Sequence, residues 1–82
     1  MNKTFIVQIR TADYIIPLFR LIKKLKFRGA ESDRLYKLIN QDGKTLATAG
    51  TSELTVDVTD VEWFYFAITN GSSSVAYVTF LE

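Results

Sequence analysis

The sequence contains no cysteine and no histidine among its 82 residues. Without cysteine, no disulfide can stabilise the fold, and no thiolate can act as a nucleophile or as a metal ligand. Without histidine, both the usual general base at neutral pH and the commonest metal ligand are missing. A catalytic or metal site would therefore have to be built from carboxylates alone.

The spacing of the carboxylates does not favour such a site. Asp57 and Asp60 fall on opposite faces of an extended chain, and a corner of the chain lies between them and the strand that follows Glu62. The serines at 72–74 have no histidine to activate them, and the four glycines are isolated, so no phosphate-cradling loop is present. We therefore expect no enzymatic activity, no cofactor and no bound metal.

Long hydrophobic runs are also lacking. The apolar run near the N-terminus is short and is interrupted by Gln8 and Arg10, which makes it a poor signal peptide, and no run approaches the length of a membrane span. We expect a cytoplasmic protein without a membrane partner, or a protein carried in a virion. A chain of this length, with 48% hydrophobic residues, is expected to form a single domain over residues 1–82.

Basic residues are absent from the second half of the chain. All ten lysines and arginines lie at or before Lys44, whereas five of the nine acids follow it. A fold that interleaves the two halves would cancel this asymmetry, and the sequence slightly favours that interpretation. Otherwise the molecule would have a basic side and an acidic side, suited to charge-steered or head-to-tail association.

The stretch from Leu54 to Leu81 carries the strongest structural signal. Trp63 to Thr69 and Val75 to Leu81 are rich in aromatic and β-branched residues, and Asn70-Gly71 between them suits a tight turn, which predicts a hairpin. Both faces of both strands are largely apolar. One face can join the core, and the other requires a cover, which another part of the chain or a second molecule would supply. The candidate anchors for a protein partner are Trp63, Tyr65 and Tyr77.

Three further regions have clear strand patterns. Lys3 to Arg10 alternates as a strand and is followed by a turn at Thr11 to Asp13. Arg34 to Ile39 and Lys44 to Ala49 predict a second hairpin, with a short helix at 33–41 as the alternative. Leu54, Val56 and Val58 alternate with polar residues, which is typical of a half-buried strand.

Residues 14–28 are ambiguous. Leu18, Leu21, Ile22 and Leu25 have helical spacing, and Pro17 could begin a helix. Alternation of apolar and basic residues over 24–28 instead fits a strand. A helix at about residues 16–28, packed on an antiparallel sheet, is therefore the alternative to an all-β fold.

From Tyr36 onward the order of features resembles the second half of an immunoglobulin-like or fibronectin-type β-sandwich. The segment Tyr36-Lys-Leu-Ile-Asn-Gln-Asp-Gly-Lys-Thr-Leu46 is similar to the third strand of that family and its turn, and Leu54-Thr-Val-Asp-Val is similar to the strand before its corner. Phe64 and Phe66 stand where the family often has a tyrosine and a disulfide cysteine, so the resemblance is one of pattern, and a jelly roll fits nearly as well. It implies strands in 14–28, and we expect an all-β, Ig-like or jelly-roll-like antiparallel sandwich of about seven strands.

These observations predict that the protein is a protein-interaction or structural module that self-associates or docks on a larger assembly. A phage or virion structural or decoration protein, or an accessory protein of a mobile element, would fit a small domain of this kind. One alternative is a nucleic-acid-binding protein, and another is a small protein inhibitor. Nucleic acid or another anionic partner would bind a cluster of five basic residues: Arg20, Lys23, Lys24, Lys26 and Arg28.

Overall fold

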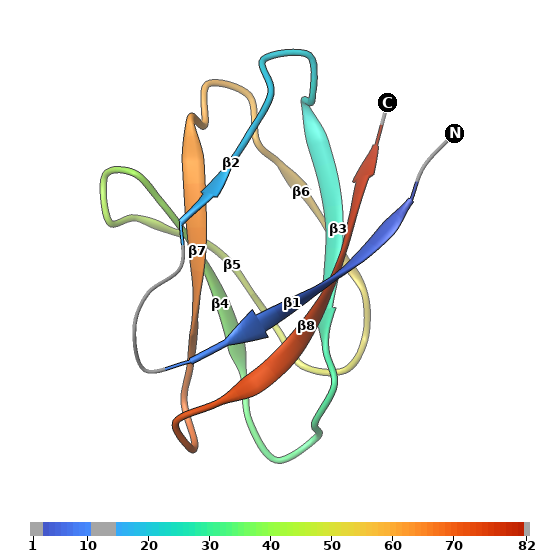
Figure 1. The fold of residues 1–82 in the computed structure, drawn as a ribbon, viewed down its shortest axis with the longest axis vertical. Coiled ribbons are helices and arrows are strands. Elements are labelled where there is room, and N and C mark those ends of the chain that lie inside the picture. Colours follow the sequence, from blue (N-terminus) through green and yellow to red (C-terminus); the bar gives the residue numbers. More distant parts are fainter. Residues whose placement is uncertain (1–2, 11–14, 82) are drawn as a thin grey trace.

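The computed structural model describes residues 3–10 and 15–81, which form eight β-strands and, within these ranges, no helix. The strands form two four-stranded antiparallel sheets with the orders β1-β8-β3-β6 and β2-β7-β4-β5 (Figure 1). The all-β sandwich is thus confirmed, and the helix at about 16–28 is wrong, because that segment forms β2, a loop and β3. The strands are β1 (Thr4–Ile9), β2 (Ile16–Pro17), β3 (Lys24–Gly29), β4 (Tyr36–Asn40), β5 (Thr45–Ala49), β6 (Leu54–Asp57), β7 (Trp63–Ile68) and β8 (Ser74–Leu81).

The strand pairs are nested. β1 pairs with β8, β2 with β7, β3 with β6, and β4 with β5, while β3–β8 and β4–β7 pairing joins these four pairs into the two sheets. A long hairpin rolled up on itself gives this order, which is the arrangement of a jelly roll. In an immunoglobulin sandwich several consecutive strands pair with each other, whereas here β4 and β5 are the one consecutive pair among the described strands. The resemblance noted above therefore extends to the sandwich architecture and not to the strand order.

The hairpin predicted over residues 63–81 is wrong. Its two strands exist as β7 and β8, but they belong to different sheets, and residues 69–73 cross from one sheet to the other. Gly71 does adopt the positive φ expected of the turn, at 90°. A turn signal of this kind specifies local backbone geometry, but it does not specify which strand becomes a hydrogen-bonded neighbour. Each is a central strand of a separate sheet, where one face joins the core and the apolar side chains of the other face are half-buried.

The other strand predictions are confirmed. β4 and β5 form the second hairpin, with Gly43 at a φ of 77° in its loop. The Asn40 side-chain oxygen accepts hydrogen bonds from the backbone N–H groups of Asp42 and Lys44, at 3.0 Å each, which closes that loop. The strands predicted at 3–10 and 54–58 correspond to β1 and β6. The turn predicted at 11–13 lies outside the described residues.

The core lies between the two sheets. Alternate residues of β3, β4, β7 and β8 point inward, and the largest fully buried side chains are Tyr36, Phe27, Phe64, Leu25, Leu38, Val58 and Val78. The Phe27 and Phe66 rings, one from each sheet, pack with centroids 5.4 Å apart. The Tyr36 ring lies against the backbone of Gly29, and a Cβ atom at Gly29 would overlap that ring. Glycine is therefore required at this position for steric reasons.

Candidate functional site

The three predicted anchors do not lie on one surface. Phe64 and Phe66 of β7 point into the core, so Trp63 and Tyr65 point outward from that sheet, with their ring centroids 6.4 Å apart. Tyr77 points outward from β8, which is in the other sheet. Trp63 and Tyr65 are both half-buried. Trp63 and Tyr65 therefore belong to one sheet and Tyr77 to the other, and their role as anchors for a protein partner stays a prediction.

The basic cluster is divided between β3 and the loop before it. Lys24, Lys26 and Arg28 alternate with core residues and point outward from β3, while Arg20 and Lys23 lie in the β2–β3 loop. Two of these cations have acidic or aromatic partners. Lys26 Nζ lies 3.8 Å from a Glu53 carboxylate oxygen, and the Arg28 guanidinium lies 4.3 Å from the centre of the Tyr77 ring.

Lys24 is paired in register with Asp57 on β6. Hydrogen bonds from Thr59 hold the pKa of Asp57 below its ordinary value, and the positive charges of Lys24 and Lys23 add to that effect. Acids from the second half of the sequence thus lie beside bases from the first half on this sheet. The fold interleaves the two halves here, which weakens the phosphate-binding potential of the basic cluster.

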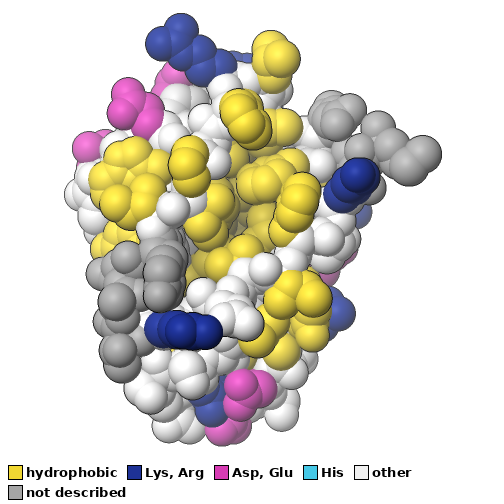
Figure 2. Space-filling view, viewed as in Figure 1, with side chains coloured by type: hydrophobic (Ala, Val, Ile, Leu, Met, Phe, Trp, Pro, Cys, Tyr) yellow, Lys and Arg dark blue, Asp and Glu magenta, His cyan; other side chains and the backbone are white. Residues whose placement is uncertain are grey.

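An apolar groove, which the sequence did not reveal, opens between the two sheets at the edge where β1 and β2 lie. Figure 2 shows apolar side chains gathered around a hollow on this face. The groove has a volume of about 300 Å³, and we name it the edge groove. Its lining residues come from the residue before β1, from β1, β2 and β8, and from the β2–β3 loop: Lys3, Phe5, Pro17, Leu18, Phe19, Ile22 and Phe80.

Two phenylalanines of the edge groove are exposed to an unusual degree. Phe5 is 48% exposed and Phe19 is 80% exposed. The Phe5 ring packs on Phe80, with centroids 5.6 Å apart, so one side of it belongs to the core while the other side remains uncovered. Large apolar side chains exposed side by side are typical of an interaction site.

The β2–β3 loop carries this apolar surface beyond the sheets. Backbone hydrogen bonds hold both of its ends, because the Leu18 N–H donates to the Glu62 carbonyl at 3.0 Å and the Lys23 carbonyl accepts from the Val58 N–H at 2.8 Å. The Ile22 N–H donates to the Phe19 carbonyl at 3.0 Å and closes the turn. Leu21 at the tip is 89% exposed. Helical spacing of leucines was the sequence signal here, but it could not indicate that the loop would present them to solvent.

A second hollow lies next to the edge groove and has a different character. It shares Leu18, Phe19 and Ile22 with the groove and has a volume of about 610 Å³. Its remaining wall carries both signs of charge, from Arg20, Lys23, Asp60 and Glu62. Within the described ranges, no three acidic, histidine or cysteine side chains gather closely enough to hold a metal ion. This hollow widens the apolar surface and gives it a polar border.

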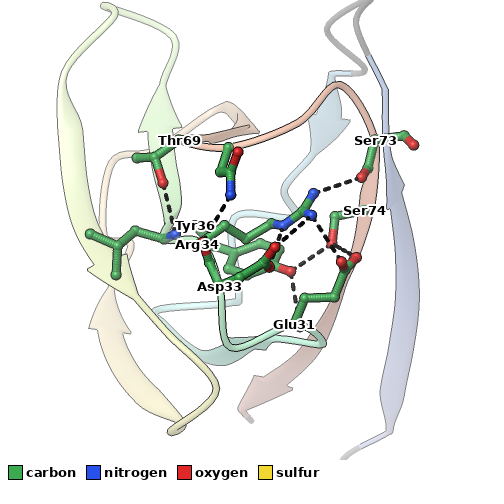
Figure 3. Close-up of polar contacts among 9 residues, drawn as sticks. Glu31, Asp33, Arg34, Tyr36, Thr69, Ser73 and Ser74 are labelled. Carbon is green, nitrogen blue, oxygen red and sulfur yellow. Dashed lines mark hydrogen bonds and ion pairs between the residues drawn. The ribbon is translucent and has the colours of Figure 1, made fainter.

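At the other end of the sandwich a cluster of polar side chains ties the β3–β4 loop to the β7–β8 loop (Figure 3). The Arg34 guanidinium donates to the Ser73 carbonyl at 3.0 Å and lies 2.9 Å from a Glu31 carboxylate oxygen. Its hydrogen bond with Asp33 lowers the pKa of that carboxyl and raises the pKa of Arg34. These groups are engaged with one another, so the cluster stabilises the loops and leaves little capacity to bind a ligand.

The hydroxyl groups of this cluster form a directed chain. Ser74 donates to Glu31 at 2.8 Å, so its oxygen is the acceptor in the 2.6 Å hydrogen bond with the Tyr36 hydroxyl, which must donate. The Tyr36 oxygen in turn accepts from the Glu31 N–H at 3.1 Å. These hydrogen bonds hold the Tyr36 ring in the position that excludes a side chain at residue 29.

The chain matches no family model, no curated protein and no solved structure. No helix that could cross a membrane occurs within residues 3–10 and 15–81.

Proposed function

We propose that this protein is a non-enzymatic interaction module that binds a protein partner through the edge groove and the adjoining tip of the β2–β3 loop. One observation carries the proposal: the large exposed apolar side chains are concentrated at one opening of the sandwich, where Phe5, Phe19 and Leu21 are 48%, 80% and 89% exposed. Ile6 and Ile15, from β1 and the segment before β2, are exposed as well. Aromatic side chains of this kind are frequent among the residues that dominate protein–protein binding energies.

The architecture is compatible with a structural role in a larger assembly. Jelly rolls are common in viral capsid and lectin domains, and a virion structural or decoration protein is the role that we favour. This step is an analogy at the level of fold, so the interaction surface supports the proposal more strongly than the architecture does.

The test compares the apolar surface with an apolar residue elsewhere. We would replace Phe19 and Leu21 together by serine, and use Leu35→Ser as the control, because Leu35 is likewise an exposed apolar residue, at 48%, but lies in the β3–β4 loop. The measurements are molar mass by light scattering across a wide concentration range, and quantitative binding to any purified partner. We expect the double variant to lose association while it remains folded by circular dichroism, and the Leu35 variant to retain it. Association that persists in the double variant would overturn the proposal.

A further inference from the structure

We propose that the partner at this surface is a second copy of the same chain, which pairs its β1 strand antiparallel with β1 across a two-fold axis. The inference rests on the proposed function, because the same opening supplies the apolar side chains. It adds the identity of the occupant and the register of pairing.

β1 is a free sheet edge. It pairs with β8 along its whole length, from Thr4 opposite Thr79 to Ile9 opposite Ser74, and no other described strand pairs with it. Its six residues, Thr-Phe-Ile-Val-Gln-Ile, contain no charge, no proline and no glycine. A regular, uncharged edge strand presents unpaired backbone N–H and C=O groups that readily accept another strand.

The other three edges carry protective features. β2 has only two residues, and one of them is Pro17, which cannot donate a backbone hydrogen bond. β6 has four residues and includes Asp57. The β4–β5 ladder shifts register between Leu38 and Ile39, which disturbs the regularity of the edge at β5. Among the four edges, β1 is therefore the one suited to pairing with another chain.

The sequence of β1 is compatible with pairing to itself. Residues directly opposite each other in an antiparallel pair point to the same face of the sheet, so a residue of one copy must stand opposite one of the same parity. Placing Ile6 opposite Ile6 of the second copy meets this condition and sets Phe5 opposite Val7 of the second copy. Both residues of the latter pair belong to the core face, because Val7 packs against the core.

The same register buries the apolar surface on both faces of the extended sheet. Ile6, which is 69% exposed, lies opposite Tyr77 on the outer face of β8, and a second isoleucine beside it would extend that apolar strip. On the inner face, the added strand directs its own Phe5 and Val7 toward the edge groove. A second β1 thus supplies the side chains that the opening lacks.

The exposed phenylalanines supply a substantial part of the apolar area that a stable contact needs. A standard interface buries about 800 Å² on each partner. A fully buried phenylalanine contributes ~150–250 Å², so Phe5 and Phe19, at their present exposures of 48% and 80%, account for roughly a third of that area. A two-fold axis also pairs both free edges at once, which closes the assembly as a dimer.

The experiment uses substitutions at Ile6, because its side chain faces solvent in the monomer. Ile6→Lys would place two like charges directly opposite each other on the two-fold axis, which destabilises a strand pair. We expect the wild-type chain to form a dimer of 9.3 kDa subunits, and Ile6→Lys to weaken the dimer by about tenfold or more while leaving the monomer folded.

A cysteine at the same position tests the register. The chain has no other cysteine, and Cα atoms directly opposite in an antiparallel pair are about 4.5–5.5 Å apart, within the range that a disulfide spans. Under mild oxidation, Ile6→Cys is expected to form a covalent dimer rapidly. Leu35→Cys, which lies in a distant loop, is the control and is expected to remain largely monomeric on that timescale.

The outcomes separate this inference from the proposed function. Suppose that Ile6→Lys does not weaken the dimer and Ile6→Cys does not become cross-linked, but that the Phe19 and Leu21 double variant abolishes association. This result would overturn β1 pairing and keep the groove as the binding site. A dimer insensitive to all of these variants would overturn both. A wild-type chain that is monomeric at all concentrations would overturn the second copy as occupant, and Phe19-dependent binding of a different protein would then support the groove alone.

Discussion

One end of this sandwich and the edge between β1 and β2 differ in how completely their side chains are satisfied within the chain. At the end formed by the β3–β4 and β7–β8 loops, the polar groups of Arg34, Tyr36 and Ser74 find partners within the chain. At the edge between β1 and β2, Phe5 and Phe19 remain exposed although they line the entrance to the core. The polar groups of the first region are satisfied within the chain, whereas the second region leaves apolar side chains exposed and is the surface that we propose for a partner. A functional surface is therefore expected where the fold leaves apolar groups uncovered.

The largest expected effect concerns the end formed by the β3–β4 and β7–β8 loops, which we call the closed end. Gly29→Ala would bring a Cβ atom into the Tyr36 ring, which is fully buried and held by its hydroxyl hydrogen bonds. We expect a loss of about 3 kcal/mol or more in the free energy of unfolding, because neither the ring nor the strand can move without opening the core. Chemical denaturation measures the effect. Gly50→Ala is the matched control, since a Cβ there meets no atom within 4 Å; equal effects of the two substitutions would contradict the steric explanation.

The hydrogen bonds of the closed end can be tested without changing its packing. Tyr36→Phe keeps the ring and removes the hydroxyl that bonds to Ser74 and to the Glu31 N–H. We expect the free energy of unfolding to fall by about 1 kcal/mol. Tyr65→Phe, at a half-buried position on the outer face of β7, serves as the control and is expected to change it by less than about 0.5 kcal/mol. A loss no larger than that of the control would show that the hydroxyl chain contributes little.

Salt distinguishes an apolar edge from a phosphate-binding surface. In the proposed dimer, Lys3 of each copy approaches the Arg10 end of the other copy's β1, so screening of these like charges is expected to tighten the dimer. Between 50 and 500 mM sodium chloride we expect its Kd to fall by about two- to threefold, as measured by analytical ultracentrifugation. Binding of DNA or RNA through Arg20 and the following basic residues would instead weaken steeply with salt. A dimer that dissociates as salt is added would contradict the β1 pairing.

Strand positions could be predicted from the sequence because alternation of apolar and polar residues reports which face of a strand is buried. This is why β1, β4, β5 and β6 were found where expected. The pairing of β7 with β8 was predicted wrongly, because a glycine turn reports local backbone geometry, whereas sheet membership depends on how the whole chain rolls up. For the same reason, the sequence could not indicate that Trp63 and Tyr77 lie on different sheets.

The candidate site was less predictable than the fold. The sequence shows that β1 is uncharged, but only the strand order reveals that it is a sheet edge. Phe19 and Leu21 are the kind of residue that normally lies in a core, and their exposure follows from the short β2 and from the hydrogen bonds that hold the ends of the β2–β3 loop. Residue type alone cannot distinguish a core side chain from an interface side chain, because both are selected for apolar burial.

The smallest expected effect concerns β6, the opposite edge of the sheet that contains β1. Hydrogen bonds from Thr59, the nearest at 2.8 Å, lower the pKa of Asp57 below its ordinary 3.8, and Lys24 adds to this effect. A lowered pKa means that the ionised carboxylate stabilises the folded state above the ordinary pKa, and that this contribution is lost as the pH falls through the folded-state value. Asp57→Asn should therefore be slightly less stable than the wild type at pH 7, and the difference should diminish as the pH falls below 3.8 and through the lowered folded-state pKa. Thermal unfolding across this pH range measures it, and Lys24→Gln is expected to reduce the difference only slightly, since the hydrogen bonds are the larger cause.

If Asp57→Asn instead promotes further association of the dimer, the charge on β6 protects that edge from pairing, which is the property that β1 lacks.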